Sequence, residues 1–581
     1  MDRLNSSRIA LGRDLFAIAL LTAAFISIDH ARATAAAAAA GDESAAVNKL
    51  FKEWDTPSSP GCAVAVMKDG RIVFERGYGM ADLNHDVKVT PATVFDVGSI
   101  AKQFTATAIL LLAQEGKLSL DDSIRKYVPE VPDFGVPVTL RQMLHHTSGI
   151  RDYEQLLWFN GWRLDSPDLL TDGDILGIVS RQKELNFPPG TDYAYSNTNY
   201  MLLAQVVSHV SGEPFEQFTK ARIFEPLGMA HTHFRSDHGE IVKNLADAYE
   251  KGDDGAFHLS LPNYDTVGAT DLLTTVEDLA HWDENFYTAK VGGQQLVNSL
   301  QEPGQLNDGT RLSYAEGLFV SPPGGLKIAE TGDAGDAGYS ANVSRFPDYH
   351  LSIATLCNNR PIDSNDLSHR VADVYLAGKF SAFLAALAVP GASVQLEPHQ
   401  LATDTGTFID RDKNLILQIE QRGNVLWAHW FWGPSSIDSE LEALTEKRFR
   451  FPNVGEIDFG DDGNVRMIEK ASGARLRPRS VPYTRVPQFK ANAADLREFA
   501  GEYSSEEMYV PYFVTLAGDQ LVLHPPKMSP SPLLALTNDV FFCDGMRLRF
   551  TRDTKGAVSG FLMSGRWNRV QNVKFERAAR R

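Results

Sequence analysis

Ser99 and Lys102, three residues apart, are the residues of this chain best suited to covalent chemistry. Residues three apart in a helix share one face, so the hydroxyl and the amine would lie side by side. A serine hydroxyl attacks a carbonyl carbon when a neighbouring base takes its proton, and a neutral lysine held in a dry pocket can be that base. The pair therefore predicts a nucleophile with its own base.

The segment that follows this pair is expected to hold it in place. Residues 105–113 are apolar almost all round and Gly116 follows them, which predicts a buried helix that ends near Gly116. Ser99 would lie at the N-terminus of this helix, where unpaired N–H groups stabilise developing negative charge. The alternative is a capping serine followed by a solvated lysine, so the assignment depends on further motifs.

A second motif, Tyr195 and Asn197, lies between a turn at 187–190 and an apolar segment over 200–210 that is expected to be a helix. A phenol and a carboxamide two residues apart in a turn can face one cleft. Tyr195 would then relay a proton beside Lys102, and Asn197 would bind a substrate amide. A tyrosine packed in the core beside a capping asparagine is the alternative.

The third motif is acidic and contains glycine. Glu330, Thr331, Gly332 and Asp333 precede a segment over 339–355 with the pattern of two strands joined by a turn. Glycine allows a strand edge to approach a ligand closely, so a backbone N–H at this point can form half of an oxyanion hole. A plain hairpin loop is the alternative, and the stretch lacks the lysine of a phosphate-binding loop.

In order and spacing, these motifs resemble those of the serine hydrolase family that groups class C beta-lactamases, D-alanyl-D-alanine carboxypeptidases, D-aminopeptidases and related esterases. The Ser-x-x-Lys signature is typical of the penicillin-recognising enzymes. The resemblance covers about residues 42 to 380 and includes four further stretches: Leu-His-His-Thr-Ser-Gly-Ile at 144–150, Ile-Phe-Glu-Pro-Leu-Gly-Met at 223–229, Leu-Leu-Thr-Thr-Val-Glu-Asp-Leu at 272–279, and Phe-Pro at 346–347 with Leu-Cys-Asn at 356–358.

The resemblance implies that Ser99 is acylated and that Lys102 and Tyr195 transfer its proton. Asn197 would contact the substrate amide. The backbone N–H groups of Ser99 and Asp333, beside Gly332, would form the oxyanion hole. No cofactor and no metal is implied.

Glu330 departs from the pattern of the family, in which this position is a lysine or a histidine. A cation there helps to orient the substrate carboxylate of penicillins or D-Ala-D-Ala peptides, whereas a carboxylate would repel it. The departure therefore favours an uncharged ester, an amide, or a substrate with a free amine. A shifted alignment is the alternative, because Asp333 and Asp336 make the whole segment acidic.

Other hydrolytic chemistries leave no comparable motif in the sequence. The chain has no Gly-x-Ser-x-Gly elbow, no His-Glu-x-x-His and no Cys-x-x-Cys, so a lipase-type triad or a zinc site has no sequence support. His145 and His146 are adjacent and so point in different directions, which favours structural histidines over a shared metal.

The N-terminus predicts export. Arg3, Arg8 and Arg13 precede an apolar run over 15–28, and small residues follow, so residues 1–35 have the pattern of a secretory signal peptide. The apolar run is short for a membrane span, and no later stretch approaches one. We expect a periplasmic or secreted protein without a membrane span once the signal is removed.

The charge of the chain restricts its partners, and its cysteine content limits the disulfides that it can form. A net charge of −18 disfavours nucleic acid and anionic membranes as partners. Three cysteines, Cys62, Cys357 and Cys543, are too few for a disulfide framework and are expected to be buried. Cys62 and Cys357 could still pair if their strands share the catalytic sheet.

The chain, at 581 residues, is too long for one hydrophobic core. Residues 36–380 are expected to form an α/β (α+β) catalytic domain with an antiparallel sheet whose last strands pair beside the first. A linker rich in Ala, Pro and Gly is expected over 381–398. Short alternating strands then predict two all-β, barrel-like domains of lipocalin-like pattern, over 399–487 and 488–581.

An internal repeat supports the two barrels. Gly406 corresponds to Gly501, and Gly423 to Gly518, at the same spacing in the chain. A catalytic domain followed by two barrels also resembles the arrangement of the D-aminopeptidases, which suits an acidic site that accepts an amine.

Together these features predict an exported serine hydrolase that needs no cofactor and forms an acyl-enzyme on an amide or ester. The expected partner is a small-molecule or peptide substrate, such as a D-amino-acid peptide or a small ester. Two alternatives stay open. One is a catalytically silent protein that binds cell-wall or peptide ligands, and the other is a beta-lactamase or D-Ala-D-Ala carboxypeptidase, if Glu330 lies outside the site.

Overall fold

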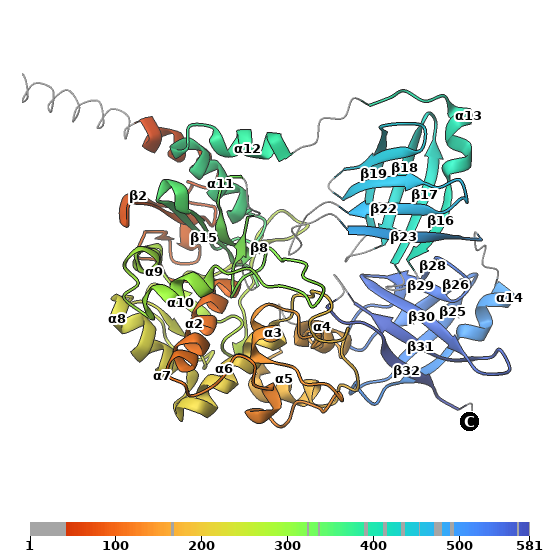
Figure 1. Ribbon diagram of the computed structural model, residues 1–581, viewed down its shortest axis with the longest axis horizontal. Coiled ribbons are helices and arrows are strands. Elements are labelled where there is room, and N and C mark those ends of the chain that lie inside the picture. Colours follow the sequence, from red (N-terminus) through yellow and green to blue (C-terminus); the bar gives the residue numbers. More distant parts are fainter. Residues whose placement is uncertain are drawn as a thin grey trace, which may run out of the picture.

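The computed structural model describes residues 42–163, 168–321, 325–334, 337–387, 393–410, 415–431, 436–452, 454–469, 479–487, 493–565 and 569–579. The predicted signal peptide at 1–35 and Asp336 lie outside the described residues. Figure 1 shows a catalytic domain, drawn red to green, and two β domains, drawn cyan and blue. Within the described ranges, no helix has the length and apolar character needed to cross a membrane.

The catalytic domain is built on an antiparallel sheet. Cys62 of its first strand in sequence pairs with Cys357 of its last, as predicted, and the two cysteines form a disulfide. Six of the described strands form this sheet, in the order β12 (Phe319–Val320), β13 (Ala329–Ala334), β14 (Ser340–Phe346), β15 (Leu351–Cys357), β1 (Cys62–Lys68) and β2 (Arg71–Tyr78).

Helices cover both faces of this sheet, which explains why β1 is buried along nearly its whole length. Ala63 and Ala65 belong to the core that includes α2 (Ala101–Gln114) and α9 (Val276–Thr288). Val64 and Val66 point to the other face and pack in the core with α11 (Ser364–Tyr375). The helix expected after Lys102 is α2, and it is buried almost all round.

The catalytic domain contains further helices and short strands besides the central sheet. The helices are α3 (Leu140–Leu144), α4 (Tyr153–Phe159), α5 (Asp172–Val179), α6 (Asn197–Ser211), α7 (Phe215–Thr219), α8 (Glu225–Leu227) and α10 (Gly293–Leu300). The short strands are β3 (Met80–Asp82), β4 (Val87–Lys88), β5 (Phe95–Asp96), β6 (Leu170–Thr171), β7 (His233–Phe234), β8 (Tyr249–Lys251), β9 (Phe257–Leu259), β10 (Tyr264–Asp265) and β11 (Leu272–Thr274).

The predicted linker at 381–398 begins as a helix. α12 (Lys379–Leu387) extends into it, because its sequence is rich in good helix formers and Phe380 packs edge-on against Phe346. A short helix, α13 (Pro398–Leu401), then leads into the first β domain.

Both β domains have the predicted all-β, barrel-like architecture. The first is a closed barrel of β16 (Gly406–Asp410), β17 (Leu415–Arg422), β18 (Val425–Phe431), β19 (Ser436–Ala443), β20 (Arg448–Phe451), β21 (Gly455–Phe459), β22 (Val465–Glu469) and β23 (Arg479–Val486). The second begins with α14 (Ala493–Leu496) and contains β24 (Gly501–Ser504), β25 (Tyr512–Ala517), β26 (Gln520–His524), β27 (Ser531–Pro532), β28 (Leu534–Ala535), β29 (Val540–Cys543), β30 (Met546–Arg552), β31 (Val558–Ser564) and β32 (Val573–Arg577), in one curled sheet.

The repeat seen in the sequence corresponds to structure. Gly406 and Gly501 begin the first strands of the two β domains, and Gly423 and Gly518 lie with positive φ in the turns that follow the second strands. The two domains therefore start with the same strand-turn-strand unit.

The second β domain contacts the catalytic domain beside α4 (Figure 1). Arg151 Nη1 donates to Glu507 Oε2 at 2.5 Å, and Arg151 Nη2 donates to the carbonyl of Gln571 at 2.8 Å. The side chains of Arg151 and Glu507 are only 1% and 5% exposed, so this ion pair is buried between the domains. The first barrel contacts the second through a small apolar cluster that includes Phe431 and Val540.

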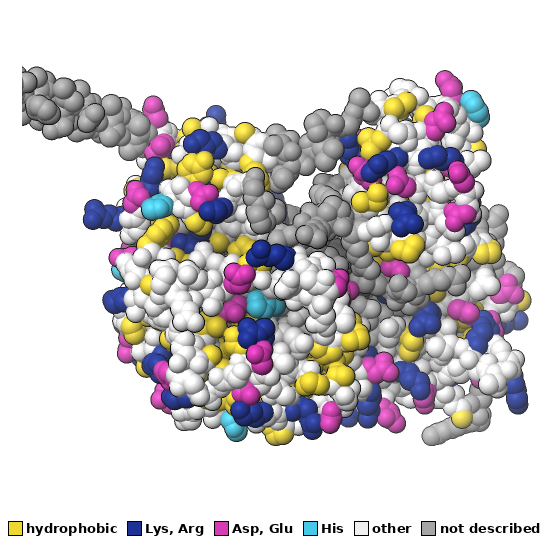
Figure 2. All heavy atoms as spheres, viewed as in Figure 1, with side chains coloured by type: hydrophobic (Ala, Val, Ile, Leu, Met, Phe, Trp, Pro, Cys, Tyr) yellow, Lys and Arg dark blue, Asp and Glu magenta, His cyan; other side chains and the backbone are white. Residues whose placement is uncertain are grey.

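The surface carries charge of both signs. Figure 2 shows Lys and Arg side chains interspersed with Asp and Glu on the face drawn there. On this face neither sign of charge gathers into one large patch.

Candidate active site

Ser99 lies in a single 3₁₀ turn, η1 (Gly98–Ile100), that leads directly into α2. Its Oγ accepts a hydrogen bond from Lys102 Nζ at 2.9 Å and another from Tyr195 Oη at 2.8 Å. Lys102 is fully buried, and its Nζ also donates to the carbonyl of Ala269 at 2.8 Å. The fold thus brings together the three side chains to which the sequence assigns covalent chemistry.

The turn that carries Ser99 is fixed from its N-terminal side. β5 ends at Asp96, which pairs with Leu273 of β11, and the carboxylate of Asp96 accepts a hydrogen bond from the N–H of Gly98 at 2.9 Å. Ser99 therefore follows a strand that is already held in a small sheet.

Tyr195 is held by the buried ring of His146. The two ring centres lie 4.3 Å apart, and His146 Nδ1 accepts the N–H of Ser196 at 3.2 Å. His146 Nε2 lies 3.1 Å from Tyr314 Oη. Because Nδ1 accepts, Nε2 carries the ring proton and donates it to Tyr314. His146 therefore positions the segment of Tyr195, a structural role of the kind expected from the sequence.

The environment keeps His146 neutral. Burial, followed by neighbouring positive charge that includes Arg569, holds the pKa of His146 well below its ordinary value of 6.5. A neutral ring is what the hydrogen bond accepted by Nδ1 requires.

Asn197 begins α6 and is 3% exposed. Its backbone N–H donates to Asp152 Oδ2 at 2.6 Å, and Asp152 in turn caps α4. In the described part of the chain, the side-chain oxygen of Asn197 is buried without a hydrogen-bond partner. Such an atom suits a role in binding a substrate amide, because a buried acceptor normally has a partner.

Gly332 and Asp333 lie in β13, where the pairing with β14 is irregular between Thr331 and Ala334. This irregular stretch is where the sequence places the second N–H of the oxyanion hole.

Glu330 lies on the opposite face of β13 from α2. Thr331 Oγ1 accepts a hydrogen bond from Gln103 of α2, and neighbouring residues of a strand face opposite sides. Glu330 Oε2 instead contacts Ser344 Oγ and His369 Nε2 of α11, each at 2.7 Å. This geometry speaks against the expectation that Glu330 repels a substrate carboxylate.

Arg569, which the sequence analysis missed, reaches the site from the second β domain. Its guanidinium carbon lies 5.0 Å from the centre of the Tyr195 ring, and its Nη1 lies 3.4 Å from Glu154 Oε2. Its carbonyl accepts the N–H of Asp152 at 3.1 Å. Nothing in the local sequence distinguishes this arginine, since Glu154 and Arg569 are 415 residues apart.

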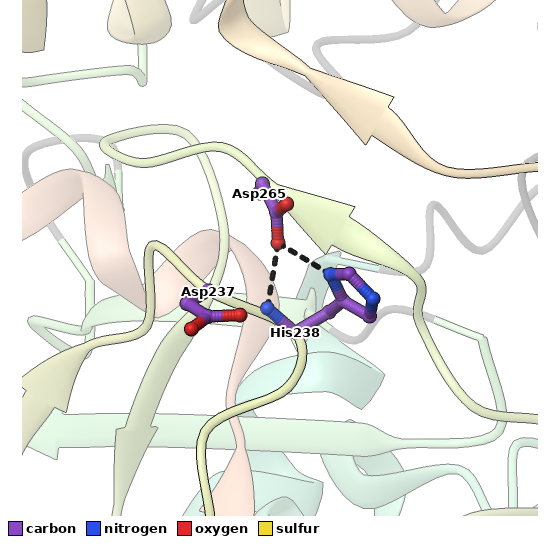
Figure 3. A group of neighbouring side chains, drawn as sticks. All are labelled: Asp237, His238 and Asp265. Atoms are coloured by element: carbon purple, nitrogen blue, oxygen red, sulfur yellow. Dashed lines mark hydrogen bonds and ion pairs between the residues drawn. The ribbon is translucent and has the colours of Figure 1, made fainter.

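Asp237, His238 and Asp265 form a group with ligand atoms close enough to share a metal ion (Figure 3). Asp265 Oδ1 accepts from the N–H of His238 at 2.6 Å and lies 2.9 Å from its Nδ1, while Asp237 accepts the N–H of Gly239. Asp237 and His238 are exposed, and these contacts are those of a hydrogen-bonded turn. We assign the group no part in catalysis.

Known proteins resemble this chain over different lengths. A D-aminopeptidase of Brucella anthropi is 25% identical over 520 residues, which is 87% of this chain and 94% of that protein. A D-aminopeptidase of Cereibacter sphaeroides is 26% identical over 450 residues, 77% of this chain and 80% of that protein. The putative penicillin-binding protein PbpX of Bacillus subtilis is 33% identical over 258 residues. This match covers 44% of this chain and 61% of PbpX, which is less than two thirds of that protein.

A solved structure shares the fold. The octameric penicillin-binding protein homologue from Pyrococcus abyssi matches with a TM-score of 0.53 and 23% identity, over 76% of this chain and 99% of that one. The family model described as Beta-lactamase matches residues 47–376. That match spans more than half of the sequence and includes Ser99, α2, Tyr195 and Asn197, and on this evidence the chain belongs to the Beta-lactamase family.

Proposed function

We propose that this protein is an exported serine hydrolase that forms an acyl-enzyme on Ser99. Its proposed substrates are amides, in particular peptides or amides of D-amino acids, with small esters as further substrates. The observation that carries the proposal is the convergence of Lys102 Nζ and Tyr195 Oη on Ser99 Oγ, at 2.9 Å and 2.8 Å. A catalytically silent binding protein would have no need of that convergence.

These contacts support a two-step reaction. In the first step Ser99 Oγ bonds to the substrate carbonyl carbon while its proton passes to Lys102 Nζ in the neutral form. Tyr195 Oη donates a proton to the leaving nitrogen and regains one from Lys102, so the amine departs neutral. In the second step water attacks the acyl ester, the acid is released, and the proton returns to Ser99 Oγ.

The substrate class is proposed from the relatives. Two proteins named D-aminopeptidases align with 77% and 87% of this chain, so the alignments extend beyond the catalytic domain into the β domains. Asn197, with its unpartnered side-chain oxygen, supplies an acceptor for the N–H of a substrate amide.

Substrates that carry a carboxylate are a second candidate, which one observation favours. Glu330 is bonded to Ser344 and His369, and Arg569 brings a positive charge near Tyr195. A cation near the nucleophile attracts the carboxylate of a D-Ala-D-Ala peptide or a penicillin. Both candidates use the same acyl-enzyme.

Covalent labelling tests the proposal. A fluorophosphonate probe should label the wild type and should not label Ser99→Ala, whose fold is checked by circular dichroism. Lys102→Arg should be nearly inactive, because a guanidinium does not release its proton. A panel of D-aminoacyl amides, their L-isomers, short esters and nitrocefin then assigns the substrate. Undiminished labelling of Ser99→Ala would contradict the proposal.

Export is part of the proposal and is supported by two features. Residues 1–35 have the pattern of a signal peptide, and Cys62 and Cys357 form a disulfide, a bond that persists in oxidising compartments. Expression of the full chain, cell fractionation and N-terminal sequencing of the product would test this. A product that stays in the cytoplasm with its first 35 residues intact would contradict export.

A further inference from the structure

Gln103 follows Lys102 directly on the nucleophile helix and is 3% exposed. Its Nε2 donates to Thr331 Oγ1 of β13 at 2.8 Å, and its Oε1 accepts the indole N–H of Trp282 at 3.0 Å. Trp282 lies in α9 and is 1% exposed. One buried amide therefore connects the nucleophile helix to a strand of the sheet and to a second helix.

The chemistry of its partners fixes the orientation of this amide. The indole N–H of Trp282 can only donate, so it must face the amide oxygen. The hydroxyl of Thr331 donates its one proton to the carbonyl of Gly317 at 3.2 Å, so it must accept from the amide nitrogen of Gln103. An inverted amide would place donor against donor at Trp282.

The connection to Thr331 lies next to an irregular part of β13. Thr331 pairs with Val343 of β14, and the register then shifts before Ala334 pairs with Ala341. Regular backbone pairing therefore stops where Gly332 and Asp333 begin. The side chain of Gln103 holds the strand against α2 immediately before this stretch.

The packing at this point leaves little freedom. Gly317, with φ of +88°, approaches α2 so closely that a Cβ would lie 2.6 Å from the backbone nitrogen of Gln103. Thr331 bonds to the carbonyl of this same glycine. A change in the contact between Gln103 and Thr331 is therefore expected to move the strand, because the neighbouring backbone is packed closely against α2.

We propose that Gln103 is a positioning residue that sets the separation between the N–H of Ser99 and the N–H of Asp333, the two donors expected for the oxyanion hole. The inference rests on the proposed acyl-transfer function. An oxyanion hole acts where charge develops in the transition state. Loss of Gln103 therefore slows acylation and leaves the affinity for the substrate almost unchanged.

Gln103→Met tests the inference in the full-length protein. Methionine keeps the length of the side chain and removes both hydrogen bonds. We expect acylation of Ser99 by a chromogenic ester to slow about ten- to a hundredfold, with KM within about twofold of the wild type. Rates are normalised to the amount of Ser99 that a fluorophosphonate finally labels, so that unfolded protein is not counted.

Two further variants separate positioning from stability. Trp282→Phe removes the second hydrogen bond of the amide and part of the buried indole ring but keeps the bond between Gln103 and Thr331, so it should lower the melting temperature and leave acylation within about twofold of the wild type. Gln114→Met is the matched control at the other end of α2, where Gln114 Nε2 donates to the carbonyl of Gly292 at 3.0 Å. It should change neither rate nor KM.

Acylation of Gln103→Met at the wild-type rate would overturn the inference and leave the proposed function intact. Equal slowing in Gln103→Met and Trp282→Phe would also overturn it, because the amide would then act only through general stability. A wild type that no acylating probe labels would overturn the proposed function itself, and the inference with it.

Discussion

The guanidinium carbon of Arg569 lies 5.0 Å from the centre of the Tyr195 ring, although the two residues belong to different domains. The second β domain thus places a positive charge beside one of the groups that contact Ser99. The candidate site therefore has a neighbour that the catalytic domain does not supply.

Replacing Arg569 by methionine should change substrate preference. The backbone carbonyl that accepts the N–H of Asp152 is kept, while the charge near Tyr195 is lost. We expect kcat/KM for a substrate with a carboxylate to fall about tenfold relative to a neutral substrate with the same acyl group, which is about 1.4 kcal/mol. Arg181→Met is the matched control, since Arg181 stacks on Tyr509 at the same domain interface. An unchanged ratio would limit Arg569 to a structural role.

Glu330→Gln should leave substrate preference unchanged. The carboxylate is bonded to Ser344 and His369, and Gln can keep the acceptor while losing the charge. The ratio of kcat/KM for an acidic and a neutral substrate should stay within about twofold of the wild type, and the free energy of unfolding should fall by about 1 kcal/mol or less. A tenfold shift of the ratio towards the acidic substrate would show that the carboxylate does reach the substrate.

Stability should fall in mild acid, in part through His146. Its pKa is held well below 6.5 in the folded protein, first by burial. As the pH falls through about 6.5, His146 is protonated in the unfolded chain but stays neutral in the folded protein. The free energy of unfolding therefore falls, by at most about 1.4 kcal/mol per pH unit. Melting curves from pH 7.5 to 5 should show this slope. The stability of His146→Asn should depend less steeply on pH over the same range. The wild-type slope in this variant would contradict the assignment of the pH dependence to His146.

A thiol assay of the unfolded protein should find one free thiol among the three cysteines. Cys62 and Cys357 are joined, and Cys543 is buried with the pKa of its thiol raised to about 12 by burial. An aromatic disulfide reagent should find no thiol in the native protein, one after unfolding without reductant, and three after reduction. Cys62→Ala with Cys357→Ala should cost about 2–5 kcal/mol of stability. A native thiol, or three thiols without reductant, would contradict the pairing.

The parts of the site that depend on local spacing could be predicted from the sequence. Ser99 and Lys102 are three residues apart in a helical segment, so their side chains had to share a face. The segment over 105–113 is apolar on all sides, so its helix had to be buried. The two barrels were predictable for a similar reason, because alternating strands and a repeat are local patterns.

The parts that depend on contacts between distant segments could not be predicted. Glu330 and Thr331 are neighbours in one strand, and only the pairing with β14 and the position of α2 decide which of them faces the nucleophile helix. Arg569 meets Glu154 across 415 residues, and no motif accompanies either residue. α12 was missed because the Ala and Pro content of 381–398 as a whole outweighed the helix-forming residues at its start.

The buried ion pair of Arg151 and Glu507 has a consequence for the order in which the parts of the protein fold. Glu507 lies 356 residues after Arg151, and Gln571, which also accepts from that arginine, lies 420 residues after it. Domains fold in the order in which they emerge, so the catalytic domain folds before Glu507 and Gln571 have been made. Arg151 gains both of these partners when the second β domain docks. The segment of Arg151 and Asp152, whose carboxylate accepts the N–H of Asn197, therefore reaches its final set of contacts last.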